Sequence, residues 1–243
     1  MNLAAVIAES DRLFNQGDHT AVGEHLRRAL ESAVKSGDRQ SELSILNELM
    51  GHYRMSNDRE RGLSAVFDAI ELIRELGIAD SVSAGTIFIN AATALHAFGE
   101  YEKAQEYYSC AYRSYTLNLA PDDRKFAGLF NNMAAVYLSQ KDFELAKAYY
   151  LEALAVLKEY GEMMDIAVTY VNLAQCVYIA DPLDLEADAY LNMAMNCFDA
   201  PLCVRDGYYA HTCIKCAGAF GVLGRKDLEK ELNSRAKEIY EGH

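Results

Sequence analysis

The sequence predicts an all-α fold of about six helical hairpins, and so about twelve helices, stacked into a solenoid. Three observations predict it. Small residues recur along the whole chain at intervals of 40 to 42 residues, and apolar residues within each interval follow the period of a helix. The three prolines, Pro121, Pro182 and Pro201, all fall between predicted helices. A regular repeat of this length indicates units that bury their apolar faces against their neighbours.

The repeats are expected to follow one another along a single domain, residues 1–243. The recurring small residue lies in the second helix of each hairpin and is alanine in all six copies, at Ala29, Ala69, Ala111, Ala153, Ala194 and Ala236. These positions place the repeats at approximately 3–38, 39–78, 79–120, 121–161, 162–200 and 201–243. The two terminal copies fit least well, and the last has Glu229 where the pattern has a small residue. Weak terminal copies are expected, because the ends of a solenoid face solvent.

The clearest copy shows a second spacing inside the repeat. Residues 132–137 read NMAAVY, and after a turn the chain continues with DFELA at 142–146. Ala146 lies nine residues after Tyr137, Tyr150 lies four residues after Ala146, and Ala153 lies three residues after Tyr150. This pattern resembles the tetratricopeptide repeat, a helical hairpin of about 34 residues.

The resemblance implies a right-handed superhelix of hairpins. The observed period exceeds about 34 residues and is similar to that of kinesin light chain-type repeats. HEAT and armadillo repeats, which run at roughly 40 to 47 residues, are the structural alternative on period alone. The spacing inside the repeat favours the tetratricopeptide assignment.

The charge of the chain excludes several classes of partner. It has 36 acidic and 23 basic residues, a formal net charge of −13 and a pI near 4.9. This balance disfavours binding to phosphate backbones and to anionic membranes. Two long segments without charged residues, 84–99 and 166–180, are shorter than the roughly 18 residues of a membrane-spanning helix. We therefore expect no nucleic-acid and no membrane partner.

The cysteines and the missing motifs bear on chemistry. Six cysteines in a chain with ample core material predict reduced thiols. The N-terminal segment has no basic region typical of a secretory signal, so we expect a cytoplasmic protein.

Cys213 and Cys216 form a CxxC pair within a predicted helix, where burial explains them; a zinc or dithiol site is the alternative. The sequence contains no phosphate-binding glycine loop, no nucleophile elbow and no HExxH motif. We expect no enzymatic activity, no cofactor and no bound metal.

The resemblance also implies where a partner binds. The first helices of such hairpins line a concave groove, into which the residue before a leucine-like position projects. An asparagine amide both donates and accepts, so asparagines there can pair with the backbone of an extended peptide. The alternative is that these amides bond to neighbouring helices or to water. The residue in question reads, from the second repeat to the sixth, Glu48, Asn90, Asn132, Asn172 and Lys215.

The full set of candidate partner-binding residues extends along the same predicted face. Its members are polar or aromatic side chains of first helices, namely Asn47, Arg54, Thr86, Asn90, Thr93, His96, Asn131, Asn132, Asn172, Gln175, Tyr178, His211 and Lys215.

The sequence thus predicts a protein-interaction scaffold that binds an extended peptide or a partner helix. Its acidity suggests another protein or peptide with a basic surface. Two alternatives remain: a peptide-sensing regulator that acts through a separate effector, and a structural module that self-associates into a homo-oligomer.

Overall fold

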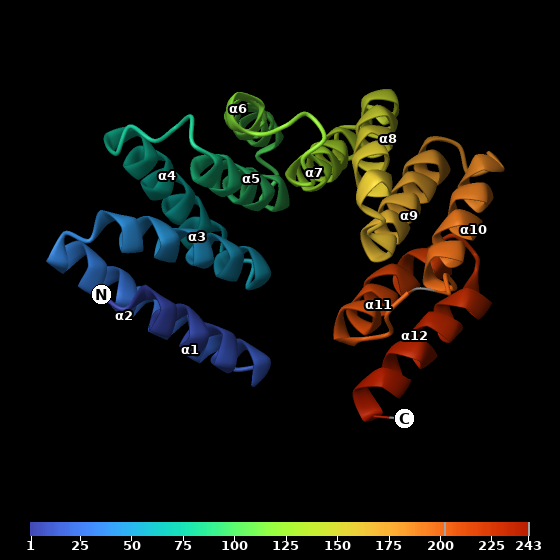
Figure 1. Cartoon of the computed structure of the whole chain (residues 1–243), viewed down its shortest axis with the longest axis horizontal. Helices are drawn as coiled ribbons and strands as arrows, with labels where there is room; N and C mark the ends of the chain where they lie inside the picture. Colours follow the sequence, from blue (N-terminus) through green and yellow to red (C-terminus); the bar gives the residue numbers. More distant parts are fainter. Residues whose placement is uncertain (202, 243) are drawn as a thin grey trace. The chain divides into compact units, whose positions relative to one another are not determined.

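The computed structural model describes residues 1–201 and 203–242; residues 202 and 243, which belong to the last predicted repeat, lie outside it. The described residues form twelve α-helices and no strand (Figure 1). In order these are α1 (Leu3–Asn15), α2 (His19–Ser36), α3 (Arg39–Met55), α4 (Arg59–Glu75), α5 (Val82–Ala97), α6 (Tyr101–Asn118), α7 (Lys125–Ser139), α8 (Phe143–Tyr160), α9 (Met163–Ala180), α10 (Glu186–Phe198), α11 (Gly207–Val222) and α12 (Lys226–Glu241).

Consecutive helices pair as antiparallel hairpins, and each predicted repeat range contains one pair. The prediction of an all-α solenoid of helical hairpins is therefore confirmed. The six recurring alanines all lie in second helices and are no more than 8% exposed. Because alanine has no side chain beyond Cβ, each allows a neighbouring helix to approach closely. The sequence period thus corresponds to one close-packed position in every hairpin.

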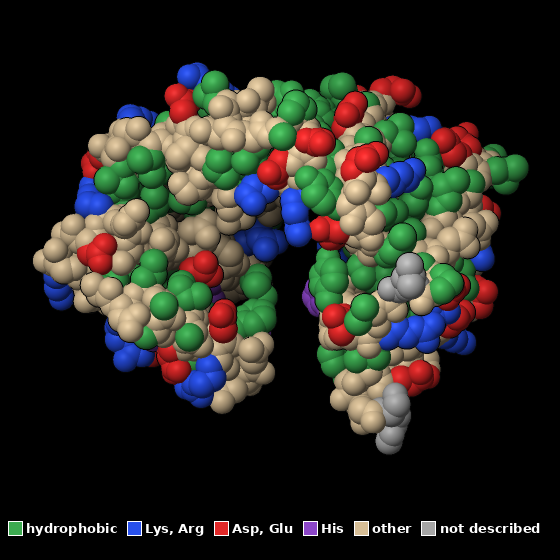
Figure 2. All heavy atoms as spheres, in the orientation of Figure 1, with side chains coloured by type: hydrophobic (Ala, Val, Ile, Leu, Met, Phe, Trp, Pro, Cys, Tyr) green, Lys and Arg blue, Asp and Glu red, His purple; other side chains and the backbone are tan. Residues whose placement is uncertain are grey.

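Helix contacts divide the chain into two compact units, Met1–Pro121 with α1 to α6 and Asp122–His243 with α7 to α12. The division falls one residue after the start of the fourth predicted repeat. In the first unit α3 packs against α2 and α5, and in the second α9 packs against α8 and α11. Acidic and basic side chains are interspersed over the visible face of each unit (Figure 2).

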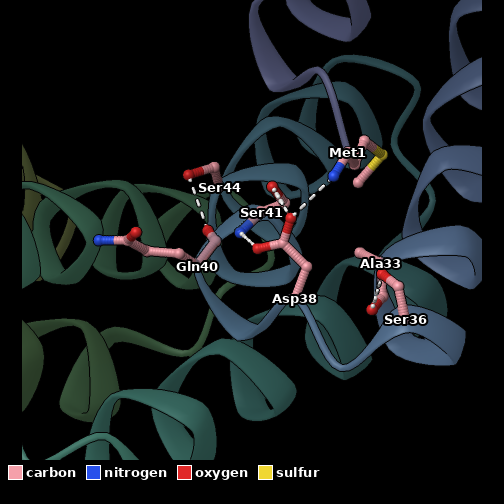
Figure 3. Close-up of polar contacts among 7 residues, drawn as sticks. All are labelled: Met1, Ala33, Ser36, Asp38, Gln40, Ser41 and Ser44. Carbon is pink, nitrogen blue, oxygen red and sulfur yellow. Dashed lines mark hydrogen bonds and ion pairs between the residues drawn. The ribbon is translucent and has the colours of Figure 1, made fainter.

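Several helices begin at an aspartate that caps the first turn. The carboxylate of Asp38 accepts hydrogen bonds from the backbone N–H and the hydroxyl of Ser41, at 3.1 and 2.8 Å (Figure 3). The same carboxylate accepts from the amine of Met1 at 3.2 Å. These hydrogen bonds to Asp38 lower its pKa. Such caps satisfy N–H groups that a helix leaves unpaired at its start. The same arrangement begins α2, α4 and α8, at Asp18, Asp58 and Asp142.

One helix of the described chain, α9, is long and apolar enough by length and composition to cross a membrane. It extends three residues beyond the uncharged run identified in the sequence. However, 56% of the helix is buried, and it packs against α8, α10 and α11. Its apolar composition is therefore explained by its place as the central helix of the second unit.

Candidate functional site

The first helices α3 and α5 are joined by two of the candidate asparagines. Asn90 Nδ2 donates a hydrogen bond to Asn47 Oδ1 at 2.8 Å, and both residues are half-buried. The side chain of Asn47 also forms a hydrogen bond with Glu48. One donor of Asn90 is thus engaged by the neighbouring helix, which favours the structural interpretation of this residue over the peptide-binding one.

Two candidate threonines connect the first and second helices of the third hairpin. The hydroxyl of Thr86 lies 3.1 Å from that of Tyr115, and the hydroxyl of Thr93 lies 3.0 Å from that of Tyr108. Both tyrosines belong to α6 and are buried. Burial raises the pKa of Tyr108 to about 12, partly opposed by the hydrogen bond to Thr93. These threonines therefore help to hold the hairpin together.

The remaining candidates of the first unit differ in their surroundings. His96 on α5 is half-buried, which lowers its pKa, and its ring centroid lies 5.7 Å from that of Tyr101. Arg54 near the end of α3 is exposed, and its charge lowers the pKa of Tyr108. Arg54 therefore remains a cationic group close to the third hairpin.

In the second unit another hydrogen bond joins successive first helices. Asn131 Nδ2 on α7 donates to the hydroxyl of Thr169 on α9 at 2.9 Å. Thr169 is fully buried, and its hydroxyl in turn donates to the carbonyl of Asp165. Asn131 Oδ1 is buried and has no hydrogen-bond partner in the described chain. Asn131 is thus another candidate that connects helices.

The other candidates of the second unit form no side-chain hydrogen bond with the described part of the chain. Asn132 on α7, and Asn172, Gln175 and Tyr178 on α9, are half-buried, whereas His211 and Lys215 on α11 are exposed. Within the residues that the structure describes, none of their side chains forms a hydrogen bond. Asn132 directly follows Asn131, and Asn172 lies one helical turn after Thr169. Unpaired amides therefore lie beside the hydrogen bond that joins α7 and α9.

A cavity that the sequence analysis missed lies between α1, α2 and α3 and has a volume of about 300 Å³. Ser10 and Asp11 line it from α1, His19 from α2, and Glu48 and His52 from α3. Its apolar wall includes Phe14, Val22, Leu26 and Met55. In the sequence, the one indication of this cavity is Glu48, a carboxylate at the position where the next three repeats have asparagine.

The ionisable groups of this cavity are shifted by their surroundings. Burial raises the pKa of Glu48; the hydrogen bond from Asn47 opposes the shift and the charge of Asp11 adds to it. Burial lowers the pKa of His52, and the charge of Arg27 lowers it further. At neutral pH this arrangement favours an uncharged imidazole beside a partly desolvated carboxyl group.

The CxxC pair is part of the core of the last hairpin. Cys213 and Cys216 are buried in α11, and burial raises their pKa values to about 11 and about 12. Both thiols therefore stay protonated at neutral pH, which disfavours metal binding and nucleophilic chemistry. All six cysteines are free.

Comparison with known proteins identifies the fold. No protein-family model matches the sequence, and no curated protein matches it either. Solved structures do match. BtubC (BKLC) from P. vanneervenii has a TM-score of 0.60 and 21% identity, over 100% of this chain and 92% of that chain. A putative kinesin light chain from Podospora anserina, with nearly identical TPR-like repeats, has a TM-score of 0.60 and 16% identity, over 82% and 94%.

A third similar structure is pilF of Pseudomonas aeruginosa, with a TM-score of 0.58 and 16% identity, over 99% of this chain and 93% of that chain. At these identities the likeness concerns the fold alone. It agrees with the spacing inside the repeat and with the buried alanine in every hairpin. The chain thus has the fold of tetratricopeptide-repeat proteins.

Proposed function

We propose that the chain is a protein-interaction scaffold that binds an extended peptide or a partner helix on its first helices. The observation that carries the proposal is the pair Asn132 and Asn172, two half-buried amides on successive first helices with no hydrogen bond inside the described chain. Half-buried amides without an internal partner are satisfied by water or by a ligand. The proposal includes no catalytic step and no cofactor.

The chemistry of these side chains suits a peptide backbone. Each amide offers two donors and one acceptor oxygen, so it can pair with a peptide N–H and a peptide C=O without reading the sequence. Gln175 adds a third amide one turn after Asn172, and Tyr178 a half-buried aromatic side chain one turn later. The binding role is therefore assigned to α7 and α9, whereas Asn47 and Asn90 mainly join helices.

Charge supports a basic partner. The net charge of −13 favours encounter with a positively charged surface, although such steering affects the association rate more than the identity of the partner. The six free cysteines support a reducing compartment, and we propose that the chain binds its partner in the cytoplasm.

Capture from a lysate of the source cell tests the proposal. The natural chain is compared with an Asn132→Ala, Asn172→Ala variant and with a matched control, Asn192→Ala, Asn196→Ala, whose asparagines are exposed on the second helix α10. We expect a partner that the natural chain and the control retain and that the first variant loses, with unchanged helical content by circular dichroism.

Other outcomes are equally informative. A partner held equally by all three proteins would overturn the assignment to α7 and α9. If no partner is retained and the mass rises with concentration in light scattering, the chain is a self-associating module. Compaction of the natural chain when a captured peptide is added would instead favour the peptide-sensing regulator.

A further inference from the structure

We propose that the cavity between α1, α2 and α3 binds one lysine or arginine side chain of a peptide, with Asp11 and Glu48 facing its cation. The inference rests on the proposed peptide-binding function and adds to it the chemistry of one side chain and the place where that side chain binds. Four features of the cavity support it.

The first feature is the charge of the lining. Two carboxyl groups, Asp11 and Glu48, border the space, and the lining includes no lysine or arginine. The lining also holds two histidines, His19 and His52, and the pKa of His52 is lowered, which favours its uncharged form at neutral pH. Arg27, whose charge reaches His52, lies outside the lining and borders a separate hollow with Asp68. The cavity is therefore suited to a cation.

The second feature is an unpaired hydroxyl. Ser10 lines the cavity, is only 7% exposed and forms no hydrogen bond within the described part of the chain. Serine hydroxyls inside helices commonly donate to a carbonyl four residues earlier, as Ser44 does to Gln40. The hydroxyl of Ser10 is therefore available to accept a hydrogen bond from an ammonium or guanidinium group in the cavity.

The third feature is the shape of the space. A volume of about 300 Å³ lies at the lower end of small-ligand sites, which suits one side chain rather than a cofactor. Leu26 and Met55 provide apolar surface for the methylene stem of a long basic side chain. The ring of Phe14 at the edge can face the cation.

The fourth feature is continuity with the first helices. Glu48 occupies on α3 the position that Asn90 occupies on α5, and Asn47 forms hydrogen bonds to both residues. The carboxyl group of Glu48 is also partly desolvated, which raises its pKa. A cation in the cavity restores a favourable interaction for its charged form.

Titration with small probes tests the inference directly. Nα-acetyl-lysine N-methylamide and Nα-acetyl-arginine N-methylamide carry the two basic side chains, and Nα-acetyl-norleucine N-methylamide is the neutral control of similar length. We expect the basic probes to bind with dissociation constants on the order of 1 mM and to shift the backbone amide signals of Ser10, Gly51 and Ser56 in NMR spectra. The norleucine probe should bind at least about tenfold more weakly.

Variants assign the binding to the cavity. Glu48→Gln keeps the size of the side chain and should weaken the basic probes by about tenfold or more. Glu71→Gln, an exposed carboxylate on α4, is the matched control and should change nothing. Gly51→Leu should abolish binding, because a Cβ at Gly51 meets no atom within 4 Å and a longer side chain there fills space beside the cavity.

Several results would overturn the inference. They are equal binding of the norleucine probe, unchanged affinity in the Glu48→Gln variant, and signal changes elsewhere than around the cavity. The probe titration needs no partner protein. A failed lysate capture with successful probe binding therefore refutes the proposed function alone, and the reverse pattern refutes the cavity alone.

Discussion

Gly62 in α4 lies directly against the ring of Phe98 at the end of α5. A Cβ built on Gly62 would lie 2.5 Å from two ring carbons of Phe98 and 3.4 Å from Cβ of Tyr53. The absence of a side chain at this position thus allows the second and third hairpins to pack closely in the first unit. Glycine inside a helix usually lowers stability relative to alanine. At position 62 we expect the opposite, because a Cβ has no room there.

We expect Gly62→Ala to lower the free energy of unfolding by about 1–3 kcal/mol, because the methyl group collides with the ring of Phe98, which must move. Gly51→Ala, in α3, should raise it by about 0.5–1 kcal/mol, since alanine is the better helix former and space is open there. Urea denaturation of the two variants measures both changes. If both substitutions change the free energy of unfolding in the same direction, the close packing of Gly62 against Phe98 is contradicted. Adding Phe98→Leu to the Gly62→Ala variant should recover part of the lost stability.

The pair Asn47 and Asn90 is expected to behave as a structural contact. Each single replacement by alanine should lower the free energy of unfolding by about 0.5–1.5 kcal/mol, and the double variant should lose less than the sum. Asn132→Ala, which removes no internal hydrogen bond, should change it by less than about 0.5 kcal/mol. A double-mutant cycle by urea denaturation measures the coupling. Additive losses would show that the 2.8 Å contact contributes nothing.

The repeat could be predicted from sequence because its determinants are local. A close-packed position excludes all but small side chains, so Ala111, Ala153 and their equivalents recur at a nearly constant interval. The hairpin turns follow similar rules: Gly99 has φ +81°, a conformation that favours glycine. Fold class and helix number therefore followed from the spacing of residues along the repeats.

The candidate site depends on contacts between repeats, which spacing within one repeat does not specify. Asn90 is equivalent in the repeat to Glu48 and not to Asn47, yet the amides of Asn47 and Asn90 meet, because the neighbouring helices are offset. The cavity likewise brings Asp11 and Ser10 of the first hairpin to Glu48 of the second. The sequence marked Glu48 and Asn90 as members of one series, but their partners became visible only with the packing of the helices.

In the second unit, Thr169 is expected to matter through Asn131. Thr169→Val keeps the shape of the buried side chain but leaves Asn131 Nδ2 without its acceptor, so the free energy of unfolding should fall by about 1–3 kcal/mol. Thr169→Ser keeps the hydroxyl and should cost less. Adding Asn131→Leu to Thr169→Val should recover much of the loss, because it also removes the unpaired Oδ1. Thermal and urea denaturation measure these differences; a double variant less stable than Thr169→Val would contradict the account.

Tyr108, one of the two buried tyrosines of α6, makes the stability of the chain depend on pH above pH 10. Tyr108 is 1% exposed, and burial raises its pKa from 10 to about 12. Because the folded state holds the phenol neutral while the unfolded state ionises it near pH 10, Tyr108 contributes its full stability below pH 10 and loses it progressively between pH 10 and 12. At about 1.36 kcal/mol per pKa unit, the loss attributable to Tyr108 is at most about 3 kcal/mol.

Tyr108→Phe isolates this contribution. At neutral pH the variant should be less stable by about 1 kcal/mol, since it lacks the hydrogen bond to Thr93. Above pH 10 its free energy of unfolding should fall less steeply than that of the natural chain, so the two curves converge. Urea denaturation from pH 8 to 11.5 measures this, with Tyr240→Phe on the exposed end of α12 as the matched control. If the Tyr108→Phe and natural curves stay parallel across this range, the phenol is not the buried, neutral group that its position in the hairpin requires.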